Sequence, residues 1–386
     1  MYMKRIGIIC EYNPFHNGHL YHINKIKEMF PDSIIILVMS GNFTERGDAS
    51  IINKWDKTDI ALTYGVNLVV ELPFVFATQS ADTFARASIE ILKHLNVDAI
   101  VFGSETNDIK KLKLMAEAQI NNKEYDKLVQ KYLNDGINYP TALSKALFDI
   151  TGKKIDKPND ILGISYIREI IKQKANIEPI CIKRNNDYNS IELNDSITSA
   201  SSIRYALEQG DNVDTYIPEK TKFYLQKDLH FNSKYFSLLK YTILIHLDKL
   251  DTFQTVDEGI ENRIKKYIVK AVSLDDLILK VKTKRYTYNK LSRMFTHILC
   301  NFTKDEAKKF KSIEYIRILG FDIKGKEYLN QIKKDISIPL ITNFSSIKSD
   351  MLDLEHRVTA VYASILDEQD KIKIIESEYK NTPIMK

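Results

Sequence analysis

Short runs of Ile and Val alternate with helix-length segments through the first half of the chain. Four such runs lead into polar loops, at residues 5–10, 33–41, 67–74 and 98–105. The segments between them, such as 20–30 and 80–95, carry apolar residues at helical spacing. Strands that are separated by helices pair in parallel, and the helices then cover both faces of the sheet. The pattern predicts an α/β fold with a Rossmann-like parallel sheet, which residues 177–184 extend.

The strand pattern fades from about residue 211. The later segments have the spacing of amphipathic or buried helices, at residues 235–247, 260–272, 288–302 and 354–366. A polar stretch at 212–220 separates the two halves. We therefore expect two domains, an α/β domain over 1–212 and a mainly helical domain over 213–386.

Composition narrows the class of protein further. The 386 residues suit two domains, and 44% hydrophobic with 28% charged residues is ordinary for a globular chain. No apolar run approaches the roughly 20 residues that span a bilayer, and no signal-peptide pattern precedes the first strand, so we expect a cytoplasmic protein without a membrane contact. Cys10, Cys181 and Cys300 form no Cys-x-x-Cys pair, which predicts neither disulfides nor a zinc site.

A His-Asn-Gly-His sequence, residues 16–19, stands between the first strand and the first helix. Ligands of parallel sheets bind beyond the carboxyl ends of the strands. Gly18 lets the backbone approach a ligand, and the helix start offers free N–H groups. His16 and His19 can donate hydrogen bonds to phosphoryl oxygens as pyrophosphate leaves. The spacing is a poor metal signature, and an ordinary polar loop explains the four residues equally well.

A second candidate anion site precedes a later helix. Hydroxyl residues at 198, 199, 201 and 202 come directly before a helix whose first turn carries Arg204. Such residues either cap the helix or form an anion nest. Together with the His-x-Gly-His sequence, the stretch resembles the Ser-Ser-Thr-x-Ile-Arg element of the nucleotidyltransferase superfamily, from which Ala200 and Ser201 depart.

Residues 280–293 form a basic run without an acidic residue, although the net charge of the chain is only +5. Tyr286 and Tyr288 are interleaved with its lysines and arginines. Basic runs with aromatic residues occur on RNA-binding surfaces. A solvated helix face with tyrosines packed beneath it has the same pattern. Composition leaves both interpretations open.

A set of longer motifs runs in order along nearly the whole chain: EYNPFHNGHLYH, MSGNFTERGD, ELPFVFATQSADTFA, VFGSE, KPNDILGISYI, TKRYTYNKLSR and YIRILGF. This set resembles the tRNA(Met) cytidine acetate ligase family. The resemblance implies a bacterial cytoplasmic enzyme with a nucleotidyltransferase-like domain. Such enzymes use ATP and acetate to form acetyl-adenylate, release pyrophosphate and then AMP, and make N4-acetylcytidine at the wobble position of elongator tRNA(Met).

The resemblance also implies particular site residues. The implied ATP-binding residues are Ile9, Cys10, Glu11, Tyr12, Asn13, Pro14, Phe15, His16, Asn17, Gly18, His19, Leu20, Tyr21, His22, Gly103, Asn159 and Arg184. His16 and His19 are the expected catalytic pair. Possible phosphate or acetate contacts are Arg46, Ser201 and Arg204, with Gln79, Ser80 and Asp82 as further acetate candidates. From sequence alone, Asn159 is better explained as a helix cap.

In this context the basic run is expected to contact RNA, through Lys282, Lys284, Arg285, Lys290 and Arg293. We expect Mg²⁺ to be carried by the ATP phosphates, with no metal site on the protein and no obligate protein partner. The alternative is a small-molecule nucleotidyltransferase of cofactor synthesis without an RNA partner. A weaker alternative is a non-catalytic tRNA-binding protein. A helical second half with a basic run favours the acetate ligase, because a cofactor enzyme does not need it.

Overall fold

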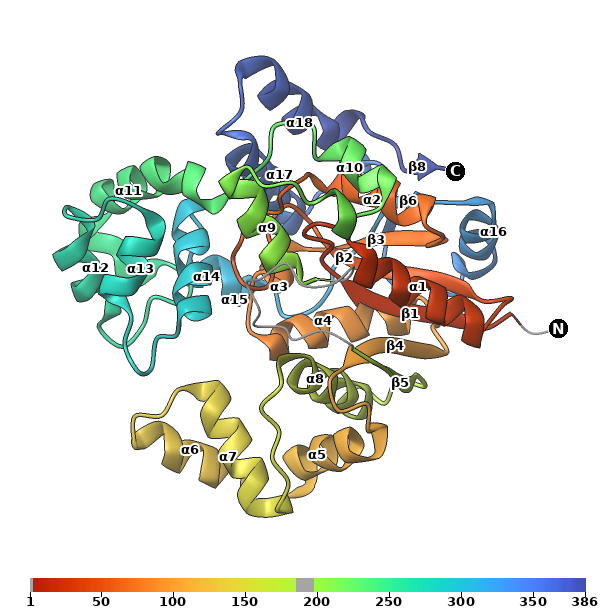
Figure 1. Ribbon diagram of the computed structural model, residues 1–386, viewed down its shortest axis with the longest axis horizontal. Coiled ribbons are helices and arrows are strands. Elements are labelled where there is room, and N and C mark those ends of the chain that lie inside the picture. Colours follow the sequence, from red (N-terminus) through yellow and green to blue (C-terminus); the bar gives the residue numbers. More distant parts are fainter. Residues whose placement is uncertain (1–2, 185–197) are drawn as a thin grey trace.

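The computed structural model describes residues 3–184 and 198–386, and its centre is an eight-stranded sheet (Figure 1). The strand order is β5-β4-β1-β2-β3-β6-β7, with β8 also paired to β6. The strands are β1 (Arg5–Cys10), β2 (Ile34–Ser40), β3 (Leu68–Leu72), β4 (Ala99–Ser104), β5 (Glu178–Lys183), β6 (Ile316–Phe321), β7 (Leu340–Ile341) and β8 (Ile384–Met385). Strands β1 to β5 pair in parallel, which confirms the predicted α/β fold.

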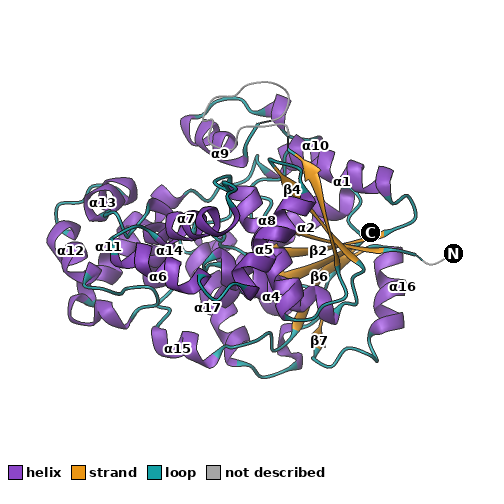
Figure 2. Cartoon of the chain, turned by 90° about the horizontal axis from the view of Figure 1, so that it is seen from below, coloured by secondary structure: helices purple, strands orange, loops and turns teal. Residues whose placement is uncertain are grey.

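Helices enclose the sheet, as Figure 2 shows. They are α1 (Asn17–Met29), α2 (Lys54–Thr63), α3 (Phe74–Ala77), α4 (Ala81–His94), α5 (Ile109–Asn121), α6 (Tyr125–Asn134), α7 (Tyr139–Thr151), α8 (Pro158–Lys172), α9 (Ala200–Gln209), α10 (Glu219–Tyr224), α11 (Phe236–Ile245), α12 (Ile260–Ile268), α13 (Leu274–Val281), α14 (Tyr288–Leu299), α15 (Lys304–Lys309), α16 (Ile323–Ile332), α17 (Asp350–Ala363) and α18 (Glu368–Lys380). Among the described residues, no helix has both the length and the apolar character that a bilayer crossing requires.

Strand β2 shows why the sheet is covered on both sides. Ile36 and Val38 belong to one core with α4, α8 and α17, whereas Leu37 and Met39 belong to a second core with α1 and α2. Successive strand side chains point to opposite faces, so a strand that is apolar throughout needs helices on both.

The chain beyond residue 213 contributes to two structures. Helices α11 to α14 pack around their own apolar core, on the left of Figure 1. The chain then returns to the sheet, where β6 pairs antiparallel with β3. No sequence pattern predicts this strand, since a short buried run that contains Arg317 and Gly320 is ambiguous. The expected division at residue 212 thus separates two sequence segments, whereas the sheet is built from both.

Arg317 of β6 belongs to a buried charge cluster. It pairs with Glu71 at 3.2 Å and with Glu378, and Lys54 lies 2.7 Å from each of these carboxylates. All four side chains are at most 3% exposed. The two cations balance the two carboxylates, which is what burial of charge requires. The cluster ties β3 and β6 to α2 and α18.

Candidate active site

His16 and His19 meet at the start of α1, directly after β1. His16 is the N-cap residue, and its Nδ1 accepts a 3.0 Å hydrogen bond from the Gly18 amide. The His19 Nδ1 accepts a 3.2 Å bond from the His16 amide. The two ring centroids lie 3.9 Å apart. The predicted pair is therefore one unit, held by the backbone that it caps.

These hydrogen bonds decide where the ring protons are. Because both Nδ1 atoms accept, a neutral ring carries its proton on Nε2. Burial, together with the charges of Arg184 and Arg204, lowers the pKa of His16 to about 3. Burial and the neighbouring His16 hold the pKa of His19 well below its ordinary value. In the free protein both rings are neutral N–H donors at pH 7, and the arginines supply the positive charge.

A cavity of about 120 Å³ lies beside these histidines. Its lining comes from the carboxyl ends of β1, β4 and β5 and from the starts of α1 and α8, and includes Ile9, Cys10, His16, Gly18, His19, Tyr21, His22, Gly103, Asn159 and Arg184. The family resemblance assigns most of these residues, from segments far apart in the chain, to one ATP site. Their position beyond the strand ends is where parallel sheets bind ligands.

Other residues of the predicted ATP-binding loop anchor the loop to the rest of the protein. Tyr12, Pro14 and Phe15 are buried in the core, and Asn17 donates to the Thr215 carbonyl at 2.9 Å. Asn13 accepts from the Ile51 amide at 2.7 Å. These residues fasten the loop rather than line the cavity.

Gly103 and Asn159 have different roles from those that their local sequence suggests. A Cβ on Gly103 would stand 2.9 Å from the Arg184 Cγ, so the glycine makes room for this arginine. Asn159 does not cap α8; its amide group donates to Glu105 at 2.7 Å. Glu105 also accepts from the Asn159 and Asp160 backbone amides and thereby caps the helix itself. Sequence reasoning missed Glu105, because nothing in the VFGSE motif indicates a distant cap.

Ser201 and Arg204 lie beside the site without lining its cavity. The N-cap of α9 is Ser199, not Ser201. Arg204 donates to the Asn13 carbonyl at 2.7 Å and pairs with Asp48 at 3.1 Å. It therefore connects the histidine loop to the loop after β2, and its positive charge lowers the pKa of His16.

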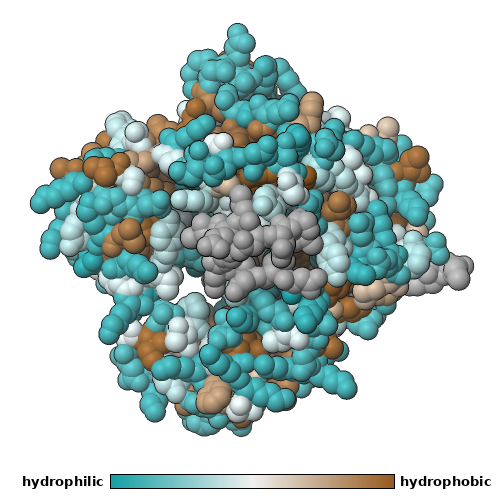
Figure 3. Space-filling view, viewed as in Figure 1, coloured by the Kyte–Doolittle hydropathy of each residue, from teal (hydrophilic) through white to brown (hydrophobic). Residues whose placement is uncertain are grey.

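A much larger chamber, about 1210 Å³, adjoins the small cavity. Figure 3 shows an opening between the α6–α7 lobe at the bottom and the α11–α14 lobe at the left. The acetate candidates Arg46, Gln79, Ser80 and Asp82 all line the chamber. Asp82 is already engaged in an ion pair, since its carboxylate lies 2.6 Å from Arg168.

The structure divides the predicted tRNA contacts into two groups. Lys282, Lys284 and Arg285 are exposed, and Arg285 lines the chamber. Lys290 and Arg293 line it from α14, where Arg293 pairs with Glu45 at 2.9 Å. Tyr286 is not available as a stacking platform, whereas Tyr288 is 39% exposed. Tyr286 is 3% exposed and donates to the Asp257 carbonyl, and the Tyr288 hydroxyl is hydrogen-bonded to Asp275.

Gly47 brings the helical lobe against the loop after β2. Its φ of +84° is in the left-handed region, and a Cβ there would stand 2.6 Å from the Arg293 backbone. The Thr296 hydroxyl donates to the Gly47 carbonyl at 2.5 Å. Only glycine permits this approach. Arg285, Lys290 and Arg293 of the basic segment therefore form part of the chamber wall.

Lys57 is a site residue that sequence reasoning missed. Its ammonium group donates to the carbonyls of Glu11, Ser40 and Gly41 at 3.0, 2.8 and 2.8 Å. Burial lowers its pKa to about 7. A lysine within an amphipathic helix carries no sequence signal for such a position.

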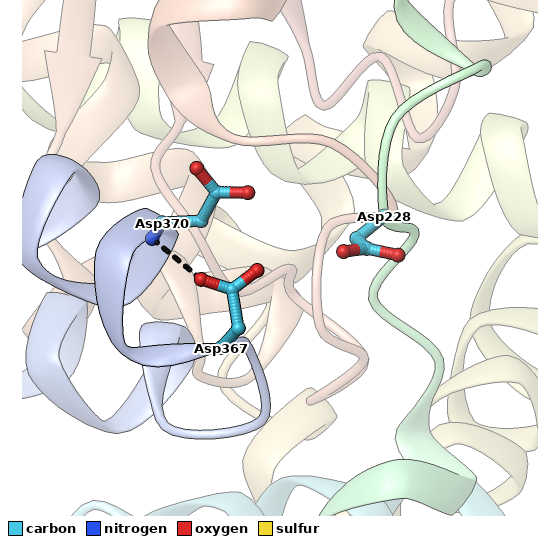
Figure 4. Close-up of side chains that lie close together, drawn as sticks. All are labelled: Asp228, Asp367 and Asp370. Carbon is cyan, nitrogen blue, oxygen red and sulfur yellow. Dashed lines mark hydrogen bonds between the residues drawn. The ribbon is translucent and has the colours of Figure 1, made fainter.

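Figure 4 shows an exposed acidic group, Asp228, Asp367 and Asp370, which is the one His, Cys or carboxylate cluster with metal-binding spacing in the described part of the chain. The Asp367 carboxylate accepts from the Asp370 amide at 3.1 Å as the N-cap of α18. Helix capping accounts for the approach of Asp367 to Asp370, and none of the three residues lines either cavity.

The fold and the capped histidine pair define a nucleotidyltransferase of the His-x-Gly-His type. In agreement, a sequence profile of the family described as HIGH Nucleotidyl Transferase matches residues 3–377. The chain belongs, within this class, to the tRNA(Met) cytidine acetate ligase family. The enzyme of that name from Anoxybacillus flavithermus is 40% identical over 400 residues, covering 99% of this chain and 100% of the relative. Its counterpart from Geobacillus sp. is 39% identical with the same coverage.

Solved structures agree over the whole chain. Thermotoga maritima TmcAL in its apo form superposes with a TM-score of 0.91 at 31% identity, and coverage is 99% of both chains. The same protein bound with alpha-thio ATP gives a TM-score of 0.89 at 32% identity, with the same coverage.

The neutral state of His16 can be tested directly. Without ATP its ring should stay neutral, with the proton on Nε2, from about pH 8 down to about pH 5, because burial and two arginines lower its pKa to about 3. ATP should raise this pKa, since phosphate charge favours the protonated ring. NMR titration of ¹⁵N-histidine-labelled protein measures both. A ring that is protonated at pH 6 without ATP would contradict the geometry.

Proposed function

We propose that the protein is an ATP-dependent acetate ligase that forms N4-acetylcytidine at the wobble position of elongator tRNA(Met), in the cytoplasm. One observation carries the proposal: the small cavity beside His16 and His19 shares lining residues with a chamber whose far wall is the basic helix α14. A nucleotide site thus opens onto a space that suits a polyanion. The names of the relatives support the tRNA substrate.

In the first step, acetate attacks the α-phosphorus of ATP and the bond to pyrophosphate breaks. The Nε2 donors of His16 and His19, the start of α1 and Arg184 are placed to bind the phosphates as charge develops. Arg46 is the proposed acetate contact. Ser201 and Arg204, which lie beside the histidine loop, are further proposed contacts for phosphate or acetate. No carboxylate lines the small cavity among the described residues, so the donor set suits phosphate oxygens, and Mg²⁺ would arrive with the phosphates.

In the second step, the cytidine amine attacks the acetyl carbonyl and AMP leaves. The target base must leave the anticodon stack, as single-stranded bases usually do in protein sites. Residues 1–212 are the proposed adenylation domain, and residues 213–386 supply the RNA contacts. The runner-up function, a cofactor-synthesis nucleotidyltransferase, has no use for a chamber of about 1210 Å³ with arginines and a lysine on its wall.

The proposal predicts one product under defined conditions. Purified protein, ATP, acetate and an elongator tRNA(Met) transcript should yield N4-acetylcytidine at the wobble position, with AMP and pyrophosphate released. Mass spectrometry of nuclease digests measures the product. Acetylation from acetyl-coenzyme A without ATP would refute the adenylate route.

The histidine pair should act in the first step. His16→Ala and His16→Asn should each slow acetate-dependent ATP–pyrophosphate exchange by about 10²-fold or more, the scale for one oriented donor. Asparagine is a good N-cap but lacks Nε2, so it separates catalysis from capping. His19→Ala should show a similar loss. Exchange at the wild-type rate in His16→Asn would leave His16 with only a structural role.

The exposed part of the basic segment should bind tRNA. Replacing Lys282, Lys284 and Arg285 with alanine should raise the Kd for tRNA and reduce the salt dependence, by about 0.7 in the log–log slope for each lost single-strand contact. The matched control is Lys265→Ala with Lys266→Ala and Lys270→Ala, which removes equal charge from exposed positions of the same lobe. Filter binding at several salt concentrations distinguishes the two variants. Equal losses would indicate general electrostatics instead of a specific contact.

A further inference from the structure

The two cavities meet at the carboxyl end of β1. Ile9 and Cys10 line both cavities, together with Asn159 and two further residues of α8. Glu11, the residue after Cys10, lines the chamber but not the small cavity. An acetyl group activated on a nucleotide in the small cavity and a base that enters from the chamber would therefore meet beside Glu11.

The chemistry of the second step requires a proton acceptor at this meeting point. The lone pair of the cytosine amine is delocalised into the ring, so the amine is a weak nucleophile. As its nitrogen bonds to the acetyl carbon, an N–H proton becomes acidic and must be removed. The departing AMP is already a stable phosphate and needs no acid. A positioned carboxylate can supply general-base catalysis here.

Three other carboxylates of the chamber wall are already engaged by cations. Glu45 pairs with Arg293 at 2.9 Å, Asp82 pairs with Arg168 at 2.6 Å, and Glu258 lies 3.9 Å from Arg285. In the two closer pairs the arginine engages a carboxylate oxygen, which is then not available to a substrate proton. Burial raises the pKa of Glu45 as well as that of Glu11, so the pKa does not separate these two groups. The Glu258 side chain is also 52% exposed, at the distant lobe.

Glu11 differs from these three. Its Oε1 accepts from the Glu45 amide at 2.6 Å and from the Ser40 hydroxyl at 3.2 Å. Its Oε2 has no hydrogen-bond partner, and the carboxylate has no ion pair within 4.0 Å, among residues 3–184 and 198–386. One oxygen is held in place and the other is available to a substrate proton.

The surroundings of Glu11 strengthen it as a base. Burial raises the pKa of its carboxyl group, while the Glu45 amide and the charges of Lys57 and Arg46 lower it, and Asp48 raises it. The balance is a pKa above the ordinary value. A carboxylate of raised pKa accepts a proton more readily near neutral pH.

We propose that the Glu11 carboxylate is the general base of acetyl transfer, an inference that rests on the proposed function. The amine electron pair forms the N–C bond with the acetyl carbon. The C–O bond of the mixed anhydride breaks, and AMP leaves with that electron pair. The amine proton passes to Oε2 of Glu11 and then to solvent. No further reactant is required.

The experiment bypasses the first step. Synthetic acetyl-adenylate and an elongator tRNA(Met) transcript are mixed with excess enzyme, and N4-acetylcytidine is measured in a single turnover. Glu11→Gln keeps an oxygen that can accept from Ser40 and Glu45 but cannot take the proton. It should reduce the transfer rate by about 10² to 10⁴-fold, and by far more than it reduces ATP–pyrophosphate exchange. Wild-type transfer should fall as acid protonates Glu11, and this limb should disappear in the variant.

The control is Glu258→Gln, which alters an exposed carboxylate of the same chamber and should leave transfer unchanged. Glu11→Ala removes both the base and the hydrogen-bond acceptor. Transfer at the wild-type rate in Glu11→Gln, with loss only in Glu11→Ala, would show a structural role and overturn the proposal. So would equal losses in transfer and exchange, or an acid limb of the transfer rate that is the same in wild type and in Glu11→Gln. If wild-type enzyme makes no N4-acetylcytidine, the proposed function itself is wrong.

Discussion

The buried ammonium group of Lys57 holds the active site together. It donates to the carbonyls of Ser40, which ends β2, and of Glu11 and Gly41, which directly follow β1 and β2. A buried cation with three carbonyl partners is satisfied, although burial still lowers its pKa to about 7. The histidine loop and the loop after β2 can therefore leave the sheet side by side. Without the lysine, three buried carbonyls at the cavity floor would lose their partner.

Segments that are far apart in the sequence meet beside these carbonyls. The loop after β2 contacts α14 through Gly47, Thr296 and the Glu45–Arg293 pair. RNA that binds along α14 would have to compete with Glu45 for Arg293, and any shift of Glu45 would move the backbone amide that positions Glu11. Under the proposed function, substrate recognition and chemistry would thus share the same few contacts.

Some of the site follows from local sequence. The His-x-Gly-His pair lies where a strand-to-helix connection of a parallel sheet must lie, and its capping bonds are made within four residues. Gly103 and Arg184 were placed in the site through the family resemblance, and the structure puts both on one cavity. The physical reason for Gly103 was different: an arginine side chain, not a ligand, takes up the space that the glycine leaves.

The sequence by itself determined the α/β core and the position of the histidine pair at its edge, because strand periodicity and helix capping are short-range effects. Only the tertiary structure decided that β6 joins the sheet, that Glu105 and not Asn159 caps α8, and that Tyr286 is buried. It also decided that Glu11 keeps one carboxylate oxygen without a partner among the described residues. Each of these outcomes depends on which distant groups satisfy a buried charge or hydrogen bond, and local spacing carries no information about such partners.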